Sequence, residues 1–229
     1  MWVRRVLRAV ASDYGLRMDV VWANPPRRHT DIAFVAEARH FDRTRLPSQE
    51  FRGTHMVRDP RDMIVSGYFY HLWTTEDWAQ EPRAELGGLS YREHLNQLDV
   101  GDGLTAEIER AVAPGGNIDE MLRWDYHSKE FLELRYEDFI ADEQSEFARL
   151  FRHYGFTEDA IALGVARGER YNFKNISRRN LGEVAPGQHL RSGRPGSWRE
   201  HFGPQHREAF KALTGDLLVA LGYEENQGW

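Results

Sequence analysis

The sequence predicts an α/β fold in which a mostly parallel central sheet is flanked by helices. Three observations predict it: an amphipathic opening segment, short apolar runs of strand length, and helix-start signals between those runs. Strands that alternate with helices are typical of parallel sheets covered on both faces. Ligands of such sheets bind at the carboxyl ends of strands, so the loops that follow strands are where a site is expected.

The chain opens with a predicted amphipathic helix. Trp2, Val6 and Val10 recur at four-residue spacing, and Gly15 follows as a natural stop. The expected extended segments that come next are 19–22, 32–36 and 51–57.

The middle of the chain carries two helix-start signals. Asp59 can cap a helix and Pro60 suits its first turn, which predicts a helix from there to about Trp73. Ser90 and Glu93 form a capping box that predicts a second start. The expected remainder is a loop at 74–88, helices at about 105–113, 118–126, 143–155 and after Thr157, a strand at 131–136, a Gly- and Arg-rich loop at about 182–197, and a last helix from Pro204 to Leu221.

Composition narrows the possible functions. The 229 residues are 41% hydrophobic, which is enough for a core, and no linker divides them, so we expect a single domain over 1–229. The absence of cysteine excludes disulfides, thiolate zinc sites and cysteine nucleophiles. None of the ten histidines stands in a metal-ligand pattern such as H-E-x-x-H, so no metal is expected.

Charge and hydropathy narrow the possible partners. A net charge of −6 gives no attraction to nucleic acid, so neither nucleic acid nor an anionic membrane is an expected partner. No apolar run approaches the roughly 18 residues that span a bilayer, and no signal-peptide pattern is present. We therefore expect a cytoplasmic protein, and the sequence leaves its oligomeric state open.

An anion site is predicted where the strand over 51–57 leads into the next helix. Arg58 stands at the strand's carboxyl end, where a guanidinium can bind phosphate through two hydrogen bonds. The helix N-terminus at Pro60 offers free N–H groups and a positive dipole end, and Ser66 adds a hydroxyl. The alternative is an ordinary turn in which Arg58 merely pairs with Asp59.

Three segments, in chain order, resemble motifs of the PAPS-dependent sulfotransferase family (PAPS is 3′-phosphoadenosine 5′-phosphosulfate). Residues 54–66, with an arginine eight residues before a serine and Asp-Pro-Arg-Asp between them, resemble its 3′-phosphate motif. Residues 135–139, Arg-Tyr-Glu-Asp-Phe, look like its strand-end motif, whose tyrosine contacts adenine. Residues 191–202 are similar to its signature loop, usually Arg-Lys-Gly followed by Gly-Asp-Trp. The resemblance runs from about Trp2 to Gly222.

The resemblance implies a P-loop-kinase-like sulfotransferase architecture and roles for particular residues. It implies that Arg58 and Ser66 hold the 3′-phosphate, that Arg191, Ser192 and Gly193 close over it, and that Trp2, Tyr136 and Phe173 border adenine. Ordinary core packing is the alternative for the aromatic residues. Two departures from the family pattern are Ser192 for the usual lysine and Ser197 for the usual aspartate, and the first removes one positive charge.

The family's first strand and its Pro-Lys-Ser-Gly-type loop around the 5′-phosphosulfate would precede Trp2. Since the sequence begins with Met1 and Trp2, that strand and loop are expected to be absent from this chain.

Histidine is the natural general base near neutral pH. His40 follows one expected strand and precedes the next, which is where the family carries its catalytic histidine. The family's usual Lys-Thr-His triplet is missing here, and Glu37 is the alternative base. His71 is a candidate for lining the acceptor pocket, and His55 is a candidate core residue.

The predicted function is therefore transfer of a sulfuryl group from PAPS, with PAP (3′-phosphoadenosine 5′-phosphate) as product, to a hydroxyl or amine of a small molecule, sugar or natural product. One alternative is a catalytically degenerate module that only binds PAP. A phosphoryl transferase is a weaker alternative, because the sequence contains no G-x-x-x-x-G-K-[ST]. The acceptor stays open, since the aromatic residues over 73–126 suit a phenol, a sugar or a glycopeptide equally.

Overall fold

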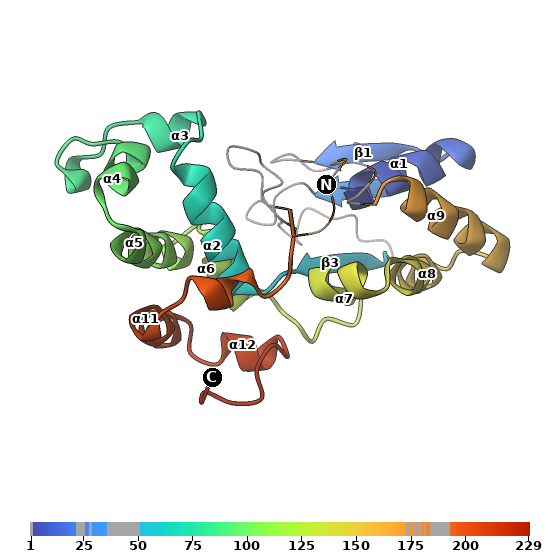
Figure 1. The fold of residues 1–229 in the computed structure, drawn as a ribbon. Helices are drawn as coiled ribbons and strands as arrows, with labels where there is room; N and C mark the ends of the chain where they lie inside the picture. Colours follow the sequence, from blue (N-terminus) through green and yellow to red (C-terminus); the bar gives the residue numbers. More distant parts are fainter. Residues whose placement is uncertain are drawn as a thin grey trace. The chain divides into compact units, whose positions relative to one another are not determined.

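A computed structural model of the chain describes residues 2–21, 26–27, 29–35, 51–172, 175, 178, 180, 182–183 and 193–229. Its helices and strands, in chain order, are α1 (Trp2–Asp13), β1 (Met18–Val21), β2 (Ile32–Val35), β3 (Gly53–Val57), α2 (Pro60–His71), α3 (Asp77–Gln80), η3 (Ala84–Leu86), α4 (Tyr91–Gln97), α5 (Val100–Val112), α6 (Asn117–Arg123), β4 (Phe131–Arg135), α7 (Tyr136–Ala141), α8 (Glu143–His153), α9 (Glu158–Arg170), η4 (Ser197–Glu200), α11 (Pro204–Thr214) and α12 (Leu217–Ala220) (Figure 1).

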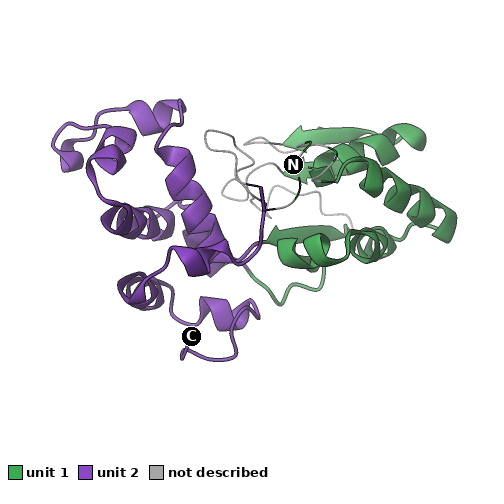
Figure 2. Cartoon of the chain, in the orientation of Figure 1, with its two compact units in different colours: residues 1–57, 125–180 green, residues 58–124, 181–229 purple. Residues whose placement is uncertain are grey.

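The chain divides into two compact units, each built from two separate stretches of sequence (Figure 2). Unit 1 comprises residues 1–57 and 125–180, and unit 2 comprises residues 58–124 and 181–229. The described strands all lie in unit 1, whereas unit 2 is helical in its described residues.

The strands of unit 1 pair in parallel, as the sequence predicts. β1 pairs with β2, with Met18 opposite Ile32, and β3 pairs with β4, with Val57 opposite Arg135. In the described residues these are two strand pairs. Parallel pairs among helices confirm the expected α/β class.

The core of unit 1 forms beneath α1. The buried side of this helix carries the four-residue repeat that the sequence shows, with Val6 and Val10 fully enclosed. The same core receives aromatic rings from α7 and α8, including Phe139 and Phe147. Apolar burial is the main stabilising contribution here, because a fully buried side chain of this size contributes about 1.5–3 kcal/mol.

In unit 2, α5 packs against several helices, among them α2, α4, α6 and α11. The predicted starts of α2 and α4 are confirmed. Asp59 caps α2 by accepting a hydrogen bond from the backbone N–H of Arg61, and Ser90 and Glu93 form the capping box of α4.

Three predictions of secondary structure differ from the structure. Residues 74–88, expected as a loop, contain α3 and η3. Tyr136 is the first residue of α7 and not the end of a strand, since Glu137 and Asp138 place negative charge in the first helical turn, where the helix dipole favours it. The last helix divides into α11 and α12 because Gly215 has a φ of 54° and a ψ of −128°, which no helix accommodates.

Candidate functional site

The predicted phosphate motif folds as a strand end, a turn and a helix. β3 ends at Val57, Arg58 and Asp59 follow, and α2 begins at Pro60. The N-terminus of α2 carries the positive end of the helix dipole, and Arg58 stands immediately before it in the chain. Ser66, on the second turn of α2, is half-buried. The predicted guanidinium, helix N-terminus and hydroxyl therefore lie along one strand–turn–helix segment, and their binding of a phosphate stays a prediction.

Arg61, the second arginine of the motif, belongs to the core. Its side chain is 1% exposed, and its guanidinium donates to both carboxylate oxygens of Asp59 at 2.9 and 2.8 Å. It also donates to Glu224. Its ζ-carbon lies 3.8 Å from the ring centre of Trp198 and 4.6 Å from that of Trp229. Arg61 is therefore fully engaged within unit 2 and is not a phosphate candidate.

Asp62 connects α2 to the end of the predicted signature loop. This carboxylate is fully buried and accepts three hydrogen bonds from one short segment. The backbone N–H of Gly196 donates at 2.6 Å, the Ser197 hydroxyl at 3.0 Å and the backbone N–H of Trp198 at 2.9 Å. We call this arrangement the Asp62 clamp. It brings together two of the three motifs, which lie about 130 residues apart in sequence.

The sequence analysis did not predict the Asp62 clamp, although both Asp62 and Ser197 lie in motifs that it identified. Asp62 lies inside the phosphate motif, and Ser197 is the residue that departs from the family's usual aspartate. A hydroxyl donates to Asp62, whereas a second carboxylate at this position would repel it. The substitution at Ser197 is thus compatible with a buried aspartate on α2.

Other parts of the signature loop are only partly described. Gly193 has a φ of 65° and is described, while Arg191 and Ser192 lie outside the described residues. Their predicted contact with the 3′-phosphate stays a prediction.

Two of the three aromatic residues predicted to border adenine lie together in unit 1. Trp2 and Tyr136 meet edge to face, with ring centres 5.7 Å apart and planes at 76°. Trp2 also meets Phe139 at 5.8 Å. The structure thus joins the first residue of α1 to the first residue of α7. Phe173 lies outside the described residues.

Glu143, at the start of α8, is the carboxyl group next to this aromatic pair. Burial raises its pKa to about 7, and the Glu169 carboxylate contributes in the same direction, while the neighbouring Trp2 indole lowers it in part. A carboxyl group that is protonated in weakly acidic solution therefore stands beside Trp2.

The two candidate bases, His40 and Glu37, lie outside the described residues, so their roles stay predictions. His55 is a partly buried strand residue, and its Nδ1 lies 2.8 Å from Glu133 on the paired strand. Within the described ranges, no group of three His, Asp or Glu side chains could hold a metal ion. No described helix has the length and apolar character needed to cross a membrane.

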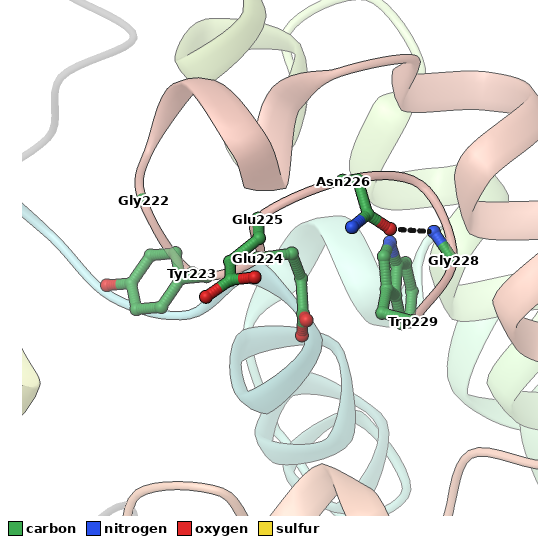
Figure 3. Close-up of a pocket in the computed structure, with 7 residues that line it drawn as sticks. All are labelled: Gly222, Tyr223, Glu224, Glu225, Asn226, Gly228 and Trp229. Atoms are coloured by element: carbon green, nitrogen blue, oxygen red, sulfur yellow. Dashed lines mark hydrogen bonds between the residues drawn. The ribbon is translucent and has the colours of Figure 1, made fainter.

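An open hollow of about 730 Å³ is lined by residues 222–226, 228 and 229 of unit 2 (Figure 3). Its walls include Glu225 and Glu224, which accepts from Arg61, and none of the seven lining residues is basic. Such walls do not suit a ligand with several phosphates, because no cation compensates the charge. This hollow is therefore not the candidate nucleotide site.

Comparison with known proteins adds an independent finding. Residues 40–222 match the family model described as "Sulfotransferase domain". Sulfotransferase 2A1 of Mus musculus is 28% identical over 222 residues, which cover 88% of this chain and 73% of the relative. Sulfotransferase 2A1 of Homo sapiens is 23% identical over 228 residues, with 89% and 74% covered.

Among solved structures, the crystal structure of mouse sulfotransferase SULT7A1 complexed with PAP is similar with a TM-score of 0.59 and 15% identity. The match covers 97% of this chain and 81% of that chain. At this identity the similarity indicates a common fold.

Proposed function

We propose that this chain, which belongs to the sulfotransferase domain family, transfers the sulfuryl group of PAPS to a hydroxyl or amine of a small-molecule, sugar or natural-product acceptor. Family membership makes it a transferase that moves sulfuryl groups. The choice of PAPS as donor is supported by the fold shared with a sulfotransferase solved in complex with PAP. It is supported further by the chemistry of the motif residues.

In this proposal Arg58, Ser66 and the N-terminus of α2 bind the 3′-phosphate, and Arg191, Ser192 and Gly193 close over it. The observation that carries the proposal is the Asp62 clamp, because it fixes residues 196–198 against the helix that begins with the phosphate motif. A loop fixed at one end loses less conformational freedom when it closes on a ligand.

Adenine is bordered by Trp2, Tyr136 and Phe173. The edge-to-face contact of the first two supports this role, since flat aromatic side chains provide the contacts that a purine face accepts.

The general base is His40, with Glu37 as the alternative. The acceptor oxygen or nitrogen forms a bond to sulfur, the bond from sulfur to the 5′-phosphate oxygen breaks, and PAP leaves. The base takes the acceptor's proton. Positioned proton transfer contributes about 10²–10⁴-fold to such rates, so His40→Ala should lower kcat by that factor and leave PAP affinity nearly unchanged.

The binding part is tested by calorimetry of Arg58→Ala with PAP and with 5′-AMP, which lacks the 3′-phosphate. PAP binding should weaken by about 1.5–3 kcal/mol, as expected for a charge-assisted hydrogen bond, and 5′-AMP binding much less. Equal losses for both ligands would contradict the phosphate assignment.

The catalytic part is tested by transfer of radiolabelled sulfate from PAPS to a panel of phenols, sugars and natural-product scaffolds. Near-native turnover in His40→Ala together with loss of turnover in Glu37→Gln would show that Glu37, and not His40, is the general base. Tight PAP binding without transfer to any acceptor would favour the degenerate binding module.

A further inference from the structure

A buried arginine joins the phosphate motif to a segment of unit 2 that lies far away in sequence. Arg61, on the first turn of α2, is 1% exposed. Its guanidinium donates to Asp59 within the motif and to Glu224, which lies 163 positions further along the chain. A guanidinium presents five N–H donors in a fixed plane, so it can serve two carboxylates at once. Arg61 therefore links the turn after β3 to segment 222–229.

Arg61 fixes the carboxylate that caps α2. Oδ1 of Asp59 accepts from the backbone N–H of Arg61 at 3.0 Å, which caps the helix, and the same oxygen accepts from Nε at 2.9 Å. Oδ2 accepts from the guanidinium at 2.8 Å. Both oxygens of the capping carboxylate are thus held by one side chain. Arg58 is the neighbour of Asp59 in the chain, so the orientation of the cap also affects the turn that carries Arg58.

Two indole rings confine the guanidinium. Its ζ-carbon lies 3.8 Å from the ring centre of Trp198 and 4.6 Å from that of Trp229. The two rings meet edge to face, with centres 5.8 Å apart and planes at 86°. A cation over an aromatic face is most strongly attracted when it is shielded from water, as the buried Arg61 is. The rings therefore hold the guanidinium in addition to its hydrogen bonds.

Segment 222–229, which carries Glu224 and Trp229 (Figure 3), is itself attached to the preceding helices. The backbone N–H of Glu224 donates to the carbonyl of Leu218 on α12 at 3.2 Å. The side-chain amide of Gln227 donates to the carbonyl of Gly215, between α11 and α12, at 2.7 Å. The segment therefore has a fixed position from which Glu224 and Trp229 contact Arg61.

Net stability does not account for this arrangement. Asp59 and Arg61 are at most 5% exposed, so both charges have lost most of their water. A buried ionic cluster is seldom more stable than well-packed apolar side chains of the same volume. What the cluster provides is a single geometry for the turn between β3 and α2.

We propose that Glu224 and Trp229 are positioning residues of the 3′-phosphate site. They hold Arg61, Arg61 holds Asp59, and Asp59 orients the start of α2 and the adjoining Arg58. Glu224 and Trp229 act on the nucleotide through these residues and do not touch it. This inference rests on the proposed function, since it takes the ligand at this turn to be the 3′-phosphate. A segment outside the three motifs thereby becomes part of the phosphate site.

The first test is calorimetry of Glu224→Ala with PAP and with 5′-AMP. The variant removes an acceptor of Arg61, so PAP affinity should fall about threefold to tenfold, the scale of coupling through an intermediate residue, and 5′-AMP affinity much less. Glu224→Gln keeps an oxygen that can accept from Arg61 and should restore most of the loss. The matched control is Glu225→Ala, which removes the adjacent carboxylate that lines the hollow and should leave both affinities unchanged.

A second variant tests the aromatic side of the arrangement. Trp229→Leu removes one ring over Arg61 and keeps both carboxylates, so it should weaken PAP selectively and by a smaller factor than Glu224→Ala. A merely structural role would lower the free energy of unfolding in urea without a difference between the two nucleotides. Equal losses for PAP and 5′-AMP, or a loss in Glu225→Ala as large as that in Glu224→Ala, would overturn the inference.

Hydrogen exchange without ligand separates this inference from the proposed function. The backbone amides of Arg61 and Met63 both donate to Asp59. Their exchange should rise in Glu224→Ala and stay unchanged in Glu225→Ala. If exchange follows this pattern but the unchanged protein does not bind PAP, the proposed function fails and the positioning of Asp59 by Glu224 stands. If the unchanged protein binds PAP and exchange is the same in both variants, the inference fails and the proposed function stands.

Discussion

The two compact units bury different chemistry. In the described residues of unit 1 the buried positions are apolar, whereas unit 2 contains all of the buried polar and charged side chains. These are Asp59, Arg61, Asp62, His71, Thr74, Ser90, Glu107, Ser197, His206 and Thr214. The proposed phosphate ligand Arg58 belongs to this polar unit, while Trp2 packs against the apolar core of the other unit and meets Tyr136 edge to face.

This difference shows how each unit is stabilised and where it is vulnerable. An apolar core gains stability from buried area and loses it when a cavity forms. A buried polar network contributes little net stability but allows only one geometry, and it is strongly destabilised when one partner is removed. The positions of the phosphate-motif helix and the loop end are therefore specified by unit 2's network.

The largest effect should come from a cavity in unit 1. Phe147 is fully buried, with its ring 5.1 Å from that of Phe139. Phe147→Ala should lower the free energy of unfolding by about 3–5 kcal/mol, measured by urea denaturation. Because no charge changes, the loss should be the same at pH 6 and pH 8. A loss of unfolding free energy below about 1 kcal/mol would contradict the conclusion that unit 1 is stabilised mainly by its apolar core.

A smaller effect should follow from opening the Asp62 clamp. Asp62→Asn replaces one accepting oxygen with an NH₂ group, which donates and cannot accept. At least one of the three hydrogen bonds to this carboxylate is then lost, at about 1.5–3 kcal/mol. Amide hydrogen exchange should rise over residues 196–202. Ser197→Ala removes a single donor and should lose less. If the two variants behave alike, the carboxylate does not hold the loop.

The next prediction compares how a variant in unit 1 and a variant in unit 2 change the affinities for two nucleotides. Tyr136→Leu should weaken PAP and 5′-AMP alike by about 1–2 kcal/mol, since both carry adenine, whereas Arg58→Ala should affect PAP. Tyr136→Phe keeps the ring and should bind both ligands almost normally. A Tyr136→Leu variant that weakens PAP alone would assign this side chain to the phosphate.

The smallest effect concerns the half-buried carboxyl group of unit 1. The pKa of Glu143 is raised from 4.5 to about 7, mainly by burial, so folding favours its protonated form. The stability it contributes should fall as pH rises from about 4.5 to 7, by about 1 kcal/mol once solvent screening is allowed for. Glu143→Gln should remove this part of the pH dependence of the urea midpoint. An unchanged profile would mean that Glu143 is ionised throughout.

Local signals predicted local structure well. The Asp59-Pro60 start of α2, the Ser90–Glu93 capping box and the strand at 131–135 depend on residues close in sequence, and the structure confirms them. The break at Gly215 was missed because a glycine inside an apolar repeat does not by itself reveal a positive φ.

Long-range relations were harder to predict. The family resemblance placed Trp2 and Tyr136 at one ligand, and the structure brings them together. The Asp62 clamp and the hydrogen bond between His71 and Glu107 join residues far apart in sequence, and no periodic pattern in the sequence predicts them. His40, Glu37, Phe173, Arg191 and Ser192 lie outside the described residues, so that part of the site stays a prediction.

The interleaving of the two units has a consequence for the order of folding. Unit 1 has all its residues once position 180 has been synthesised, but unit 2 needs the stretch that starts at 181. Until Gly196, Ser197 and Trp198 leave the ribosome, Asp62 has no donors, and a carboxylate without donors keeps its water. During vectorial synthesis we expect the apolar unit to form first, while Asp62 on α2 lacks the donors that lie more than 130 positions downstream. Closing so long a loop slows folding, so we expect the hydrogen bonds of the Asp62 clamp to form late.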